Sequence, residues 1–214
     1  MIVGKRMSTK LITVPPDLTL PEAFALMKKE NIRRLVIVDR GKMVGLVTKN
    51  DLENALPSKA TSLSIWEINY LVEKVKVSDV MIKDVITVNE ETPIEEAARL
   101  LGEKKISCLP VLRNGDVVGI ITETDLFQIF LEVLGALHTG IRFSAELSVE
   151  PGSIAKLTQA IYQAGGNIIA FGTFMGESIS KDEVTVKVQG VDVETLKAAI
   201  EPFILNLLSI SEVV

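Results

Sequence analysis

Reactive side chains are scarce in this chain, which has one cysteine and one histidine, Cys108 and His138, among its 214 residues. A lone cysteine cannot form an internal disulfide and suits a reducing compartment, so we expect a cytoplasmic protein. A zinc site would need two or more carboxylates besides these side chains, and no suitable spacing occurs. The sequence has no arrangement of nucleophile, base and orienting group either. It therefore predicts no metal site and no catalytic residues.

Long apolar runs are also missing. None reaches the roughly 20 residues that a bilayer requires, and the first six residues lack the apolar stretch of a signal peptide. The net charge is −5, with ten Lys/Arg against six Asp/Glu in residues 1–56 and five against eleven in residues 77–138. An acidic chain without a basic stripe is a poor candidate for binding long nucleic acids. We expect no membrane and no long nucleic acid as partners, whereas the basic first segment suits a small phosphorylated ligand.

An internal duplication sets the organisation of the chain. Residues 7–52 align without a gap on residues 81–126, 74 positions later, and 15 of these 46 positions are identical. The alignment places Gly45, Thr48 and Asp51 on Gly119, Thr122 and Asp125. A repeat of this length predicts two copies of one structural unit.

Each copy predicts the order β-α-β-β-α. A short apolar strand (11–14 and 85–88) precedes an amphipathic helix, because apolar residues recur at helical spacing. Two strands follow, 35–38 and 43–47 in the first copy and 109–112 and 117–121 in the second, and Asn114-Gly115 is a strong hairpin signal. A second helix begins near Thr48 and Thr122 and extends in the second copy over about 125–137. The expected buried helix faces are Leu20, Ala23, Phe24 and Met27, and Ile94, Ala97, Ala98 and Leu101.

The unit resembles the CBS domain over residues 7–56 and 77–138, and Gly-h-h-Thr-x-x-Asp in both copies, where h is apolar, is the most specific part. The resemblance implies that the two copies form a Bateman-type module. Family members bind adenosyl ligands such as AMP, ADP, ATP or S-adenosylmethionine in the cleft between paired copies. They generally act as sensors that control an attached or associated protein.

The Thr-x-x-Asp motif has two interpretations. It is typical of a capping box, in which Thr48 or Thr122 caps a helix. The same geometry also suits a nucleotide. The backbone amides of the helix start and the threonine hydroxyl can donate hydrogen bonds to a phosphate, and Asp51 or Asp125 can accept hydrogen bonds from the ribose hydroxyls. The two roles are compatible, and two copies in register favour ligand contact by at least one of them.

By resemblance, the walls of the adenine slot are the first strand and the segments 32–35 and 106–110. Arg33 and Arg34 stand where the second copy has Ser107 and Cys108. Guanidinium groups would offset the charge of a polyphosphate, although a solvated surface is the alternative. Cys108 lies between buried positions and is interpreted as a packed thiol. The candidate cleft residues are Thr13, Ile32, Arg33, Thr48, Asp51, Thr87, Ile106, Ser107, Pro110, Thr122 and Asp125.

Residues 57–76 link the two copies. Residues 63–72 predict a helix capped by Ser62 or Ser64, and it carries the single tryptophan of the chain, Trp66. The apolar residues lie on almost all sides of this helix, so we expect the helix to be sandwiched between other surfaces of the protein. Packing is the default interpretation of Trp66 and Tyr70, and an aromatic box for a ligand is the alternative.

Residues 139–214 predict a ferredoxin-like βαββαβ order, which makes the whole chain α+β. The expected strands are 141–149, 167–171, 182–189 and 207–213, and the helices lie at about 154–164 and 193–204. This segment resembles the ACT domain, a small-molecule sensor of amino-acid metabolism, through residues 149–154 and 165–168. The resemblance implies an amino-acid pocket, usually between two subunits, that involves Glu150, Gly152, Asn167 and Ile168. Glu150 directly precedes Pro151, whereas the family usually has an Asp one place further upstream.

The order of a CBS pair (1–56 and 77–138) and an ACT domain (139–214) resembles the acetoin-utilisation AcuB-type proteins. We expect a non-enzymatic homodimeric sensor with an adenine nucleotide or S-adenosylmethionine as regulatory ligand, no catalytic cofactor and an unknown regulated protein. A ligand-free structural or dimerisation module is the first alternative, and an enzyme is the second. The strand at 168–174, with Trp66 and Tyr70, is the expected apolar surface for a second copy.

Overall fold

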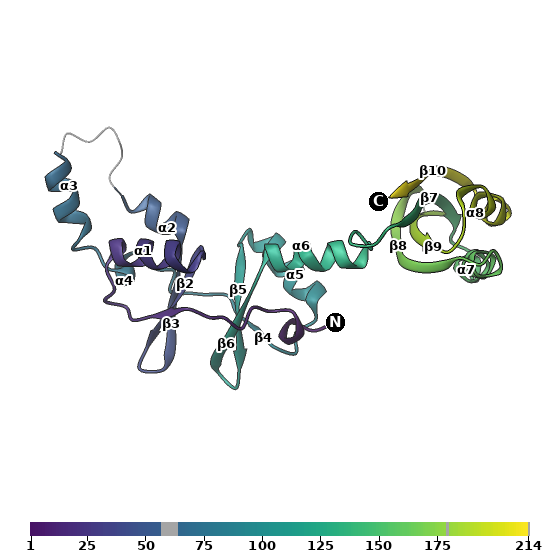
Figure 1. Ribbon diagram of the computed structural model, residues 1–214. Coiled ribbons are helices and arrows are strands. Elements are labelled where there is room, and N and C mark those ends of the chain that lie inside the picture. Colours follow the sequence, from purple (N-terminus) through teal and green to yellow (C-terminus); the bar gives the residue numbers. More distant parts are fainter. Residues whose placement is uncertain (57–63, 179, 214) are drawn as a thin grey trace. The chain divides into compact units, whose positions relative to one another are not determined.

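The computed structural model describes residues 1–56, 64–178 and 180–213, and the fold is α+β (Figure 1). The chain divides into two compact units, Met1–Leu126 and Phe127–Val214. The first unit contains the duplicated segments, and the second contains a separate four-stranded sheet.

Both copies of the repeat have the expected β-α-β-β-α order, in sheets ordered β1-β2-β3 and β4-β5-β6. The leading strands β1 (Thr13–Val14) and β4 (Val88–Asn89) are each two residues long, shorter than predicted, and pair in parallel with the next strand. Positive φ angles at Arg40, Gly41, Asn114 and Gly115 form the tight turns of the two hairpins. The remaining elements are α1 (Leu20–Glu30), β2 (Arg34–Asp39), β3 (Lys42–Thr48), α2 (Lys49–Asn54), α5 (Ile94–Lys104), β5 (Cys108–Arg113), β6 (Asp116–Thr122) and α6 (Glu123–Val133).

The helix faces follow the predicted spacing with one exception. Leu20, Ala23 and Met27 of α1 are buried, as are Ala97 and Leu101 of α5. Ala98 is exposed, so its predicted burial is wrong. It stands at the position of Phe24, which is itself only half-buried, and its methyl group is too short to reach the core from that edge of the face.

The segment that leads into each repeat packs in the core of the other repeat. Val3, in the 3-10 helix η1 (Val3–Lys5), is fully buried in the cluster of the second copy. Val77, in α4 (Val77–Val80), is fully buried in the cluster of the first copy. Backbone hydrogen bonds join Ser8 to Ile120 in both directions, and others join Ile82 to Leu46. The two copies are therefore interleaved, and each completes its core with a segment that precedes the other.

The linker helix α3 spans Ile65–Val72. Ser64 caps it, because the Ser64 hydroxyl accepts a hydrogen bond from the amide of Glu67 at 3.3 Å; Ser62, the other predicted cap, lies outside the described residues. Trp66 is 84% exposed and Tyr70 is 59% exposed, so these side chains are not sandwiched between surfaces of the same chain. The Nζ atom of Lys74 lies 4.0 Å from the ring centroid of Tyr70.

The second unit has the ferredoxin-like βαββαβ order, with an antiparallel sheet ordered β10-β7-β9-β8. Helices α7 and α8 pack on a core that contains Phe143 and Val186. Ile168 and Phe171 also pack against this core, so the prediction that the strand at 168–174 is left over for a partner is wrong for them; Phe174 is exposed. The elements are β7 (Gly140–Ser148), α7 (Ser153–Gln163), β8 (Asn167–Ser178), β9 (Lys181–Gln189), α8 (Val193–Ile200), η2 (Glu201–Phe203) and β10 (Asn206–Val213).

The helix cap formed by Thr19 and Glu22 should make the stability of the first unit depend on pH. The pKa of Glu22 is lowered because its carboxylate accepts hydrogen bonds from the hydroxyl and the amide of Thr19. A carboxyl group whose folded pKa lies below its unfolded value stabilises the fold above that unfolded value, and the contribution is lost as the pH falls through the folded pKa. We expect Glu22→Gln, which keeps an acceptor but cannot titrate, to reduce the loss of thermal stability between about pH 5 and about pH 3. Calorimetric melting curves that fall equally in both proteins would contradict this.

Candidate functional site

Two cavities in the first unit combine residues from both copies. The Asp125 cleft, of about 470 Å³, is formed by Leu11, Ile12 and residues 32–34 of the first copy and by residues 122–125 of the second. The Asp51 cleft, of about 360 Å³, is its counterpart: Val85, Ile86 and residues 106–108 of the second copy with Thr48 and Asp51 of the first. Both volumes suit a small-molecule ligand, which typically occupies about 300–1,000 Å³. Each Thr-x-x-Asp motif therefore meets the slot of the opposite copy.

The motif is a helix cap that uses one of the two carboxylate oxygens of the aspartate. The Oδ2 atom of Asp51 accepts hydrogen bonds from the amide of Thr48 at 2.8 Å and from its hydroxyl at 2.7 Å. Asp125 repeats the arrangement with Thr122 at the same two distances. Within the described part of the chain, the Oδ1 atom of each carboxylate accepts no hydrogen bond. Capping and ligand binding are therefore compatible, because they use different oxygens.

The glycine before each motif has a packing role. A Cβ atom added at Gly45 would lie 2.5 Å from the sulfur of Met81 and 2.9 Å from the carbonyl oxygen of Ile82. One added at Gly119 would lie 2.6 Å from the sulfur of Met7 and 2.9 Å from the carbonyl oxygen of Ser8. Glycine thus lets the segment that leads into the other copy, here called the crossing segment (residues 7–8 or 81–82), lie directly on the strand that ends at the motif. This contact holds the motif of one copy against the slot of the other.

Eight of the eleven predicted cleft residues line one of the two clefts: Ile32, Arg33, Thr122 and Asp125 in the Asp125 cleft, and Thr48, Asp51, Ile106 and Ser107 in the Asp51 cleft. Thr13, Thr87 and Pro110 line neither cavity. Leu11 and Ile12 line the Asp125 cleft in place of Thr13, and Val85 and Ile86 line the Asp51 cleft in place of Thr87. Pro110 is buried in β5. The sequence prediction missed Lys10 and Asp84, which the duplication aligns with each other and which lie in opposite clefts.

Arg34 lies where the two copies meet. Its Nη2 atom donates a hydrogen bond to the carbonyl oxygen of Ser107 at 3.1 Å. Its Nε atom is buried and has no hydrogen-bond partner among the described residues. A buried donor without a partner costs about 1–3 kcal/mol, so an incoming acceptor would be favourable. Arg33 and Arg34 also line a third cavity of about 330 Å³, beside Thr48 and Glu123.

Cys108 lines the Asp51 cleft but is almost fully buried. Burial raises the pKa of its thiol, and the neighbouring Arg34 guanidinium opposes that shift only in part. A thiol attacks disulfide reagents as the thiolate, so the folded protein should react slowly at neutral pH. We expect an aromatic disulfide reagent to modify Cys108 at least tenfold more slowly in the native protein than in denaturant. Equal rates would show that the thiol is open to solvent and that the packed interpretation is wrong.

The second unit has a cavity of about 510 Å³ around the turn between β7 and α7. Glu150 and Gly152 line it, together with Thr173 and Asp182, which the sequence prediction missed. The other two predicted residues lie elsewhere, because Asn167 and Ile168 pair with Gln189 and Val188 at the opposite end of the sheet. The four predicted residues therefore do not meet within one chain.

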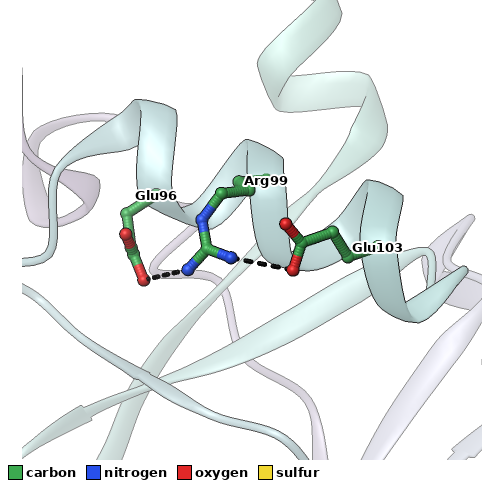
Figure 2. A network of polar contacts seen from close by, with 3 residues as sticks. All are labelled: Glu96, Arg99 and Glu103. Carbon is green, nitrogen blue, oxygen red and sulfur yellow. Dashed lines mark hydrogen bonds and ion pairs between the residues drawn. The ribbon is translucent and has the colours of Figure 1, made fainter.

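Acidic residues on α5 are held by a local network. The Arg99 guanidinium donates one hydrogen bond to Glu96 and one to Glu103, each at 2.8 Å (Figure 2). These ion pairs are exposed and contribute little to stability.

Among the described residues, no group of three or more His, Cys, Asp or Glu side chains could hold a metal ion. No helix within the described ranges is long and apolar enough to cross a membrane.

Comparison with known proteins identifies the family. The family model of the CBS domain matches residues 3–58 and 77–132, more than half of the chain. A CBS domain-containing protein from Dictyostelium discoideum is 31% identical over 136 residues, which are 63% of this chain and 94% of that protein. The chain therefore belongs to the CBS-domain family and carries a tandem pair of these domains, generally a regulatory module.

Two solved structures share this fold. A proposed acetoin utilization protein (AcuB) from Vibrio cholerae is 30% identical with a TM-score of 0.53, and the match covers 64% of this chain and 95% of that one. The CBS domain pair of protein MJ0100, in complex with methylthioadenosine and S-adenosyl-L-methionine, is 28% identical with a TM-score of 0.52. That match covers 64% of this chain and 98% of the other. An adenosyl ligand is thus bound by a CBS pair of related sequence.

Proposed function

We propose that the first unit is a regulatory module that binds an adenosyl ligand in one or both clefts between its CBS repeats. The observation that carries the proposal concerns Asp51 and Asp125, which line the two cavities opposite the slot of the other copy. The Oδ1 atom of each accepts no hydrogen bond from the residues that the structure describes. A carboxylate at that place can accept hydrogen bonds from the hydroxyl groups of a ribose. Half-buried apolar side chains such as Ile12 and Ile86 provide a surface for adenine. The bound ligands of the MJ0100 pair support the same class of ligand.

Ligand binding should change how the two copies are arranged relative to each other. Each cleft is built from both, so a ligand bridges them and favours arrangements in which the walls approach. A ligand shifts an equilibrium only by its differential affinity for the two states. We propose that occupancy is passed on through this arrangement to the second unit or to a regulated protein.

The alternative function is a ligand-free structural module that acts by contact. Thermal melting with AMP, ADP, ATP, S-adenosylmethionine and methylthioadenosine separates the two. A ligand at 100 times its dissociation constant stabilises the folded state by about 2.7 kcal/mol, whereas a structural module melts unchanged. An assay for turnover of the same compounds tests the enzyme alternative.

We further propose that the second unit is an ACT-type sensor for an amino acid. The support is the cavity at the start of α7, where Gly152 has a φ of 91° and opens the helix. The first backbone amides of α7, an eleven-residue helix, attract the carboxylate of an amino acid. The side chains of Asp182 and Glu150 can accept hydrogen bonds from its ammonium group. Melting of the protein with each of the twenty amino acids tests this, and Asp182→Ala should abolish any shift.

The protein should form a homodimer through surfaces that include α3. Trp66 and Tyr70 are large apolar side chains left mostly in solvent, and solvent-exposed aromatics are typical of interfaces. We expect light scattering to give twice the 23.3 kDa of the chain at micromolar concentration. The double variant Trp66→Asp/Tyr70→Asp should shift the protein towards monomer. A wild-type monomer would contradict the prediction.

A further inference from the structure

The two clefts differ in charge at positions that the duplication makes equivalent. The differing pairs, 74 residues apart, are Lys10 and Asp84, Asn31 and Lys105, Arg33 and Ser107, and Arg34 and Cys108. The Asp125 cleft therefore has three cationic side chains against Glu123 and Asp125. The Asp51 cleft has one cation, Lys105, against Asp51 and Asp84. The first cleft is net positive and the second is net negative.

Ion pairs show which of these cations are free. The Nζ atom of Lys10 lies 3.2 Å from a carboxylate oxygen of Glu30, so its charge is already offset. In the described part of the chain, Arg33 and Arg34 have no ion pair, and Arg34 keeps a buried Nε–H without an acceptor. Both guanidinium groups also line the third cavity, which shares Glu123 with the Asp125 cleft and Thr48, Asn50 and Ser107 with the Asp51 cleft. With Lys10 offset, Arg33 and Arg34 balance Glu123 and Asp125 in the Asp125 cleft, whereas Lys105 leaves the Asp51 cleft net negative. The two clefts still differ in charge, and the guanidinium of Arg33 and the Nε–H of Arg34 can donate to an anion.

We infer that the two clefts take adenosyl ligands of different charge. This inference rests on the proposed function. The Asp125 cleft takes a ligand with a 5′-phosphate, because guanidinium groups bind phosphate with paired, charge-assisted hydrogen bonds. The Asp51 cleft takes one whose 5′ substituent is uncharged or cationic, such as a methylthio or sulfonium group. Asp84 would repel a phosphate there, and Val85 and Cys108 offer apolar contact.

The duplication supplies a test that preserves net charge. Arg33→Ser/Ser107→Arg exchanges the side chains at two equivalent positions and leaves the hydrogen bond from Arg34 in place, because that bond goes to the backbone of residue 107. AMP and methylthioadenosine are titrated by calorimetry into the wild type and the exchange variant. Each protein is also measured with Asp51→Ala or Asp125→Ala added, to show which cleft is used.

In the wild type, we expect AMP affinity to fall at least tenfold with Asp125→Ala and with Arg33→Ser, and methylthioadenosine affinity to fall only with Asp51→Ala. In the exchange variant, AMP binding should depend on Asp51. Dependence of both ligands on the same aspartate, or AMP binding that still depends on Asp125 after the exchange, would overturn the inference and leave the proposed function intact. If the exchange variant fails to fold, Arg33→Gln replaces it, and unchanged AMP affinity in Arg33→Gln would overturn the inference. Absence of any binding to the wild type would instead remove the proposed function.

Discussion

Gly119→Val should destabilise the first unit by about 1–3 kcal/mol, the usual cost of overpacking a well-packed site. A Cβ atom at this position would lie 2.6 Å from the sulfur of Met7 and 2.9 Å from the carbonyl oxygen of Ser8. The methionine side chain can move, but the carbonyl belongs to the backbone that pairs with Ile120. The crossing segment must therefore lift off the strand, which also withdraws Val3 from the core of the second copy. Urea unfolding monitored by circular dichroism measures the effect.

Gly102→Ala is the matched control. Gly102 is exposed in α5, and an added Cβ atom would have no neighbour within 4 Å. Alanine at such a helical position should stabilise the protein by about 0.5–1 kcal/mol. We therefore expect the two substitutions to change the free energy of unfolding in opposite directions. A Gly119→Val protein as stable as the wild type would mean that the crossing segment does not hold the two copies together.

The double variant Asp51→Ala/Asp125→Ala should weaken binding of an adenosyl ligand by about tenfold to a hundredfold at each occupied cleft. Loss of a charged acceptor that holds ribose hydroxyls costs about 1.5–3 kcal/mol of binding. Loss of the two caps should also cost about 0.5–2 kcal/mol of stability each. Calorimetric titration gives the affinity, and urea unfolding gives the stability.

Glu22→Ala separates these two effects. Glu22 accepts from the amide and the hydroxyl of Thr19, as Asp51 accepts from Thr48, but it lines neither cleft. This control should therefore lose stability and keep ligand affinity. If the double aspartate variant behaves in the same way, the motif is only a helix cap and the assignment of both clefts is wrong.

The local structure of the repeats follows from the sequence for physical reasons that can be named. Turn residues such as Asn114 and Gly115 adopt positive φ angles at low cost, and helical spacing of apolar residues defined α1 and most of α5. Ala98 shows the limit of spacing alone, because a small side chain at the edge of a face need not reach the core. The length of β8 was underestimated, since the strand continues to Ser178, past its predicted end at residue 171.

The site was less predictable than the fold. The duplication drew attention to Asp51 and Asp125, but pattern alone does not tell which slot each will meet. That pairing depends on the exchange of lead-in segments, and Val3 and Val77 resemble any other apolar residue in the sequence. The strand end was also misplaced: Leu11 and Ile12 line the Asp125 cleft, while Thr13 begins β1 outside it. Side-chain alternation in a two-residue strand gives no sequence signal for that difference.

Calorimetric titration of the wild-type protein with AMP and with methylthioadenosine tests the central claim most directly. The account predicts saturable binding of at least one of them, with no more than one site per cleft and therefore at most two adenosyl groups per chain. It also predicts that the bound ligand raises the melting temperature of the first unit. No heat of binding and no change in melting temperature with either compound at millimolar concentration would contradict it.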